Sequence, residues 1–116
     1  MQFQQSLTNS DIQLAQTLED FIPDEVFDIH AHPYHESHFR QNAFSFLSQT
    51  KQLGCNEHRR HLQQYMAAKT IHGLYFGLPH ISADRSAMNE WVNNEVKQHG
   101  TSISKSLIVV SPKDEP

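Results

Sequence analysis

Two histidines in the first third of the chain, His30 and His32, are the residues whose type and spacing best suit chemistry. If they lie on a β-strand, both imidazoles project from the same face, with backbones about 6.5–7 Å apart. That spacing lets both rings converge on one ion, at about 2.0–2.1 Å from each ligating nitrogen. The alternative is a pair of polar side chains on a solvated face of a sheet. The surroundings of the strand decide whether the two histidines are part of a metal site or are simply exposed to solvent.

The pair lies within residues 25–33, which have the alternating pattern of a strand and end at Pro33. Its place at the end of the strand favours a site, because parallel α/β folds bind ligands at the carboxyl ends of their strands. We interpret Asp28, deeper on the strand, as a structural hydrogen-bond acceptor. Strict alternation predicts two faces, one with Phe27, Ile29 and Ala31 and the other with Asp28, His30 and His32.

Helical and strand patterns alternate along the whole chain, which predicts an α/β fold with a parallel sheet built of βαβ units. Parallel sheets are covered on both faces, so the face that carries the histidines should be dry. Because unpaired buried polar groups are costly, a metal ion would supply the partners that both rings need. We expect a single domain over residues 1–116, with a helix and lead-in at 1–23 and three strands with intervening helices at 24–116.

Local signals predict where the elements begin and end. Residues 34–56 are polar, lack a strand pattern and are expected to form a long functional loop. Gly100 occupies the position where a left-handed C-cap is expected. The expected helices run from Asn9 or Ser10 towards Phe21, over 57–69 with Asn56 as the cap, and from about Asp84 to His99, and the expected later strands are 71–79 and 105–111.

Residues 26–33, VFDIHAHP, resemble the first-strand signature of the amidohydrolase superfamily, and of its amidohydrolase-related branch in particular. Residues 74–79, 89–92 and 108–112 resemble the second strand, second helix and third strand of that branch. The resemblance thus spans most of residues 24–116. The branch includes metal-dependent hydrolases and some decarboxylases.

The resemblance implies a (β/α)8 barrel of the TIM type that holds one or two divalent metals at the carboxyl ends of its strands. Of the family's metal ligands, the first-strand pair maps onto His30 and His32, and zinc is the expected ion. The family's later histidines and last-strand aspartate have no counterpart in this sequence. A complete barrel takes about 250 residues. The 116 residues are therefore expected to form its first three strands, a partial barrel.

Four residues near the expected strand ends could contact a small polar substrate: Tyr34, His35 and Arg40 after the first strand, and His80 after the second. Arg40 would suit a carboxylate-bearing substrate. The alternative for each is an ordinary exposed side chain, and His38 is likewise expected to be a solvated loop residue. Surface, packing or structural roles are expected for His58, His61, His72 and His99.

Composition excludes several other classes of function. The net charge is −4 and the nine Lys and Arg residues are scattered, which argues against a nucleic-acid partner. The single cysteine, Cys55, excludes an internal disulfide framework. No apolar run approaches the roughly 20 residues that span a bilayer, and no secretory signal is visible. A cytoplasmic protein with no membrane partner is expected.

The sequence therefore predicts the N-terminal segment of a metal-dependent hydrolase that uses a metal-activated water on a small polar substrate. This interpretation treats the chain as a fragment of a longer enzyme. One alternative is a truncated, non-catalytic module that binds metal or associates with itself as a homo-oligomer, inactive if 116 residues are the whole protein. Another is a decarboxylase of the same superfamily.

Overall fold

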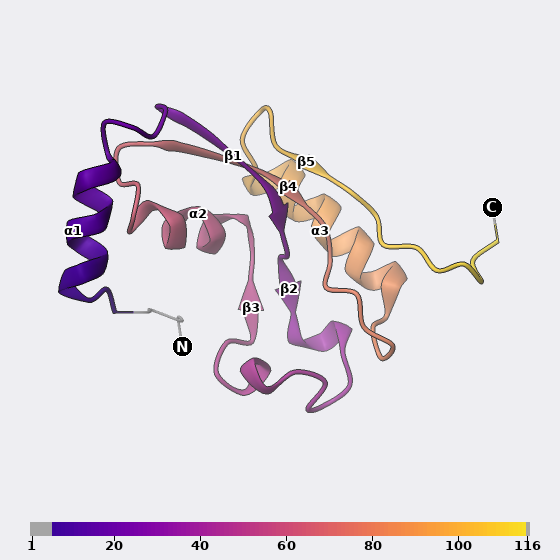
Figure 1. The fold of residues 1–116 in the computed structure, drawn as a ribbon. Helices are drawn as coiled ribbons and strands as arrows, with labels where there is room; N and C mark the ends of the chain where they lie inside the picture. The colour runs from indigo at the N-terminus through magenta and orange to yellow at the C-terminus, as the bar shows by residue number, and fades with distance from the viewer. Residues whose placement is uncertain (1–5, 116) are drawn as a thin grey trace.

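The computed structural model describes residues 6–115, which form three α-helices and a three-stranded parallel sheet of order β1-β4-β5 (Figure 1). Two βαβ crossovers join the strands, through α2 and then α3, and the mixed α/β class with a parallel sheet is confirmed. The sheet is open, so no barrel closes within the described residues. Its elements are α1 (Asn9–Leu18), β1 (Glu25–Ala31), α2 (Cys55–Gln63), β4 (Thr70–Tyr75), α3 (Arg85–His99) and β5 (Lys105–Ser106).

The helix ends are set by side chains, partly as predicted. Asp84 caps α3 by accepting the N–H of Ala87, as expected. Thr8 caps α1, one residue before the predicted Asn9, through a reciprocal pair of bonds with Asp11. Helix α1 ends at Leu18, short of the predicted Phe21, and none of its residues is buried.

Helix α2 begins and ends earlier than the predicted 57–69, and Asn56 is not its cap. Gly54 is the cap, and its N–H is accepted by the Glu57 carboxylate at 3.0 Å. The N–H of Cys55 is accepted by Glu95 of α3 at 3.1 Å. A carboxylate from a helix 40 residues away therefore fixes this helix start, which no local signal reveals.

Gly100 ends α3 in an extended conformation, with φ −72° and ψ 160°, so the predicted left-handed cap is wrong. Its N–H donates to the carbonyl of Val96 at 2.9 Å. A Cβ on residue 100 would lie 2.5 Å from that carbonyl oxygen. Glycine is therefore needed here for close approach of two backbones, not for its freedom in φ.

One residue is inserted in β1 relative to β4. The ladder pairs Asp28 with Gly73 and then Ala31 with Tyr75, with a register shift between the two pairs. Asp28 and Ala31 consequently both face the helices, since Asp28 contacts His58 of α2 and Ala31 packs in the core with Tyr75. The predicted line of three polar side chains along one face is therefore wrong, because a bulge reverses the alternation within the strand.

Helices α2 and α3 cover one face of the sheet (Figure 1). The core beneath them joins Ala31 of β1 and Tyr75 of β4 to Cys55 of α2 and Val92 of α3. The opposite face is open, and Ile29 of β1 is 72% exposed. Sequence reasoning predicted a sheet covered on both sides, and within the described residues this is wrong.

The third strand is shorter than the predicted 105–111, since only Lys105 and Ser106 join the ladder. The chain stays extended beyond them because Asn89 of α3 brackets Val109, donating to its carbonyl at 3.0 Å and accepting its N–H at 2.9 Å. Strand β4 likewise stops at Tyr75, before the predicted residue 79.

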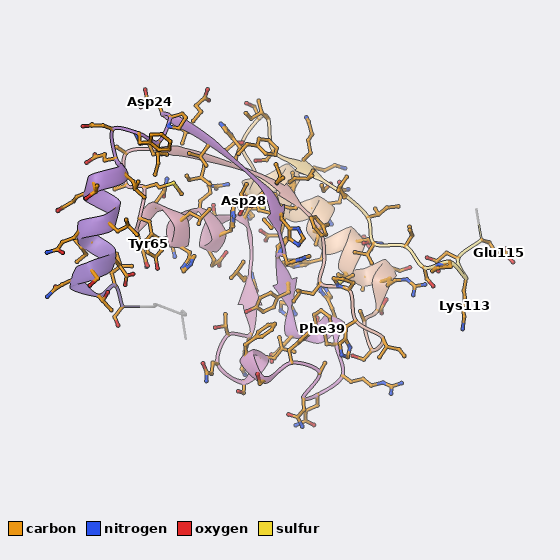
Figure 2. The ribbon with its side chains drawn as sticks, viewed as in Figure 1. Asp24, Asp28, Phe39, Tyr65, Lys113 and Glu115 are labelled. Atoms are coloured by element: carbon orange, nitrogen blue, oxygen red, sulfur yellow. The ribbon has the colours of Figure 1, made fainter. Side chains whose placement is uncertain are left out.

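The sequence predicts a polar loop without strands over 34–56, but residues 34–53 form a packed excursion from the sheet and residues 55–56 begin α2. The excursion contains β2 (Tyr34–His35) and β3 (Gln52–Leu53), paired antiparallel, and two 3-10 turns, Glu36–His38 and Ser45–Ser48. Its own apolar cluster joins Tyr34, Phe39 and Leu47 to Met88 of α3. The excursion lies beyond the end of β1, with Phe39 inside it (Figure 2).

Candidate functional site

The two histidine rings meet at the carboxyl end of β1. Their Nε2 atoms lie 3.0 Å apart, and the rings are edge-to-face with centroids 4.8 Å apart. Two nitrogens bound to one tetrahedral ion at about 2.0–2.1 Å would lie about 3.3 Å from each other. At 3.0 Å the two nitrogens are within hydrogen-bonding distance of each other. An opening of a few tenths of an ångström would let both occupy two positions of a metal's coordination shell.

The backbone after β4 orients His32. Its Nδ1 lies 3.1 Å from the carbonyl oxygen of Phe76 and 3.2 Å from that of Gly77. A carbonyl only accepts, so Nδ1 must carry the proton, and in the neutral ring the lone pair is on Nε2. Metal-binding histidines characteristically donate their other ring N–H to a carbonyl or carboxylate. His32 is therefore held in the tautomer and orientation that a metal ligand requires.

The ring of Phe76 packs against both histidines. Its centroid lies 5.1 Å from that of His30 and 4.5 Å from that of His32, both in edge contacts. Phe76 follows Tyr75, which faces the helices, so the histidines share the open face of the sheet. His30 is exposed and His32 is half-buried there.

Asp28 supports His30 from the other side of the strand. One carboxylate oxygen accepts the main-chain N–H of His30 at 3.0 Å, and the other contacts Nε2 of His58 at 2.8 Å. Nδ1 of His58 in turn lies 2.9 Å from the hydroxyl of Tyr75. Burial raises the pKa of Asp28, but its hydrogen bonds and the nearby histidine charges outweigh burial and hold that pKa below its ordinary value. Asp28 is thus a hydrogen-bond acceptor, as interpreted from the sequence.

Sequence reasoning missed His58 and Tyr75 as parts of this network. His58 lies 30 residues from Asp28 on a helix, and nothing in the spacing links the two. Cys55 is buried beside the network, and burial, with the charge of Glu95, raises the pKa of its thiol to about 12. The thiol is therefore protonated at neutral pH and suits neither nucleophilic attack nor metal binding.

The four predicted substrate contacts gather on the excursion and beside it. Tyr34 is buried against Phe46, and burial raises the pKa of its hydroxyl against an opposing hydrogen bond from Thr50. His80 is half-buried, with Nδ1 2.8 Å from the hydroxyl of Ser82. Among contacts of the described residues, none joins Tyr34, His35, Arg40 or His80 to either histidine of the pair.

An open cleft of about 890 Å³ lies within the excursion. His35 and Arg40 line it together with Lys51 and apolar rings such as Phe39. The structure thus brings two of the four predicted substrate contacts, His35 and Arg40, together in one cleft. Neither His30 nor His32 lines that cleft.

His38 is buried, so the expectation of a solvated loop residue is wrong. Its ring packs edge-on against Trp91 of α3, with centroids 5.5 Å apart, and its Nδ1 has no hydrogen-bond partner among the described residues. Burial lowers the pKa of His38 and the neighbouring His35 lowers it further, against an opposite effect of Asp84. His72 is also buried, between Glu25 and Thr101, in the structural role expected of it.

No cluster of three or more His, Cys, Asp or Glu side chains suited to a metal ion occurs within residues 6–115. Catalytic zinc sites use three protein ligands. The described residues therefore supply at most the two histidines of β1 and fall short of a complete catalytic zinc site.

Over the same range, residues 6–115, none of the helices combines the length and hydrophobicity that crossing a bilayer demands.

Comparison with known proteins adds no relative. No family model matches the chain, and no curated protein or solved structure is significantly similar to it. The resemblance to amidohydrolases, and with it the barrel, the zinc and the reaction, stays a prediction that rests on the residues themselves.

Proposed function

We propose that this chain is the N-terminal segment of a metal-dependent hydrolase of the amidohydrolase type, in which His30 and His32 are two ligands of one divalent ion. The observation that carries the proposal is the convergence of their Nε2 atoms to 3.0 Å. The carbonyls of Phe76 and Gly77, which fix the tautomer of His32, support it. Zinc is the ion that such a nitrogen pair is expected to hold.

A divalent ion, when bound, lowers the pKa of a water and polarises a carbonyl group. The chain's own residues would bind the ion and orient its two histidine ligands. His32 presents a fixed lone pair, and Asp28 holds the main chain of His30. The ring of Phe76 lies against both imidazoles and keeps water from that side of them. The substrate of the proposed reaction is a small polar molecule.

The barrel is part of the same proposal. In a (β/α)8 barrel the helices surround the outside of the strands and the site lies at the carboxyl ends. Two features of the open sheet support this proposal: α2 and α3 cover one face, and the histidines lie at the end of β1 on the other. The exposed Ile29 supports further strands as the cover for the open face. Those strands would also bring the remaining metal ligands.

A second candidate function is a self-associating, metal-binding module without catalysis. The observation that favours it is an exposed apolar segment just after β5, in which Ile108 and Val110 are 69% and 66% exposed while Val109 between them packs against the cluster that contains Met88 of α3. Apolar patches of this kind mark interaction surfaces. A monomer in size-exclusion chromatography at high protein concentration would contradict this candidate. A decarboxylase would use the same histidine pair and differ only in the reaction.

The proposed function is tested by metal content. The full-length protein, loaded with Zn²⁺ and dialysed, is expected to retain at least one ion per chain by elemental analysis, and the double variant His30→Ala, His32→Ala is expected to lose one. His99→Ala, which removes an exposed histidine from the end of α3, is the matched control and should retain the ion. Equal zinc in all three proteins would overturn the proposal.

A further inference from the structure

A polar chain runs through the interior between β1, α2 and β4. It consists of Asp28, His58 and Tyr75, joined by contacts of 2.8 and 2.9 Å. His58 is 9% exposed and Tyr75 is fully buried. Asp28 lies on the part of β1 that runs beside the end of α2 (Figure 2). We call these three residues the interior chain.

The interior chain is fully satisfied along its length. The carboxylate of Asp28 only accepts, so Nε2 of His58 donates to it, and Nδ1 lies within hydrogen-bonding distance of the Tyr75 hydroxyl, which can both donate and accept. Each link fixes the rotamer of the next side chain. A buried polar network of this kind is costly if any member lacks a partner, so its members are expected to act as a unit.

The interior chain ends at the bulge of β1 that presents His30 and His32. The ladder with β4 skips from Asp28 to Ala31, so Ile29 and His30 have no paired residue opposite them. The second carboxylate oxygen of Asp28 accepts the N–H of His30 across this gap. The carboxylate thereby fixes the backbone at the point where the strand turns the His30 side chain to the open face.

We infer that the interior chain positions His30 for metal binding, with His58 and Tyr75 as positioning residues that act through Asp28. This inference rests on the proposed function, since it gives His30 a metal to bind. His58 holds the carboxylate, the carboxylate holds the bulge, and the bulge sets the distance between the two Nε2 atoms. Loss of His58 then loosens the ligand pair without removing a ligand.

Zinc affinity of the full-length protein, measured by competition with a chelator, tests this inference. His58→Leu keeps the volume of the side chain and leaves Asp28 without its partner, and it is expected to weaken zinc binding by about tenfold or more, as outer-shell substitutions do. His58→Gln, whose amide can still donate to Asp28, is expected to recover most of the affinity. Tyr75→Phe removes one hydroxyl and should give a smaller loss, which keeps the test valid if His58→Leu does not fold.

A matched control separates positioning from stability. His72 of β4 is buried like His58 of α2 and also pairs with a carboxylate, that of Glu25 at 3.1 Å, away from the bulge. His72→Leu should therefore lower the melting temperature and leave the zinc affinity of the folded protein unchanged. The visible spectrum of the Co²⁺-loaded protein should shift in His58→Leu and not in His72→Leu.

The outcomes distinguish this inference from the proposed function. Zinc binding by the parent that is equally tight in His58→Leu and Tyr75→Phe would overturn the inference and leave the proposed function standing. Equal weakening in His72→Leu and His58→Leu would overturn it as well, because a general loss of stability would then explain both. A folded parent that binds no zinc would overturn the proposed function and the inference with it.

Discussion

At the scale of single residues, the structure separates histidines that face a potential ligand from those that serve the interior. His30 and His32 converge on the open face. His58 and His72 are buried against carboxylates, and His38 is buried with no partner for Nδ1 among residues 6–115. The spacing of His30 and His32 could be recognised in the sequence, because two positions on one strand fix their geometry. Burial of His38 could not, because it depends on Trp91, which lies 53 residues later in the chain.

The lowered pKa of His38 predicts a pH dependence of stability. The unfolded chain binds the proton more tightly than the folded one, so the contribution of the neutral ring is complete above the ordinary histidine pKa of about 6.5 and is lost as pH falls from there towards the lowered value. His38→Phe should therefore lose less of its free energy of unfolding than the parent does below about pH 6.5. Urea denaturation on both sides of this pH measures the difference. His99→Gln is the control, and a parent-like pH dependence in His38→Phe would contradict the account.

At the scale of elements, the order of helices and strands could be predicted from hydrophobic periodicity and from caps such as Asp84. Those signals are local, and the structure follows them. The start of α2 and the bulge in β1 could not be predicted in this way. The first depends on Glu95 of another helix, and the second on the register between two strands. The excursion escaped prediction because its strands have two residues each and its core is completed by α3.

The two capping side chains are expected to differ in their effect on global stability. Helix α3 buries Met88 and Val92, so loss of its cap in Asp84→Ala should lower the free energy of unfolding by about 1 kcal/mol. Helix α1 buries none of its residues, so Thr8→Ala should let α1 fray with little effect on the global transition. Chemical denaturation followed by tryptophan fluorescence compares the two variants. An equal loss in both would contradict the view that α1 adds little to the core.

At the scale of the whole molecule, the sheet has helices on one face and apolar side chains exposed on the other. Long exposed faces of this kind are covered by further polypeptide or lead to association. The α/β class and the parallel sheet followed from the sequence alone. Closure of a barrel is a property of the complete set of strands, and the three strands of the described residues form an open sheet.

A charge on the exposed apolar segment after β5 should oppose association of the 116-residue chain. Ile108→Lys places a charge among exposed apolar side chains and is expected to shift the chain towards monomer in size-exclusion chromatography with light scattering. Ile81→Lys is the matched control, because Ile81 is fully exposed in the loop after β4 and belongs neither to the sheet nor to the segment 107–110. Association that both substitutions disrupt equally, or that neither disrupts, would contradict a role for this segment.

The most direct test of the central claim is to locate a metal in the full-length protein by anomalous diffraction at the zinc absorption edge. The account predicts an anomalous peak about 2.0–2.1 Å from Nε2 of both His30 and His32. It also predicts that Nδ1 of His32 still donates to the backbone of Phe76 and Gly77 in the zinc-loaded crystal. Zinc bound elsewhere, with both Nε2 atoms free of it, would contradict the account.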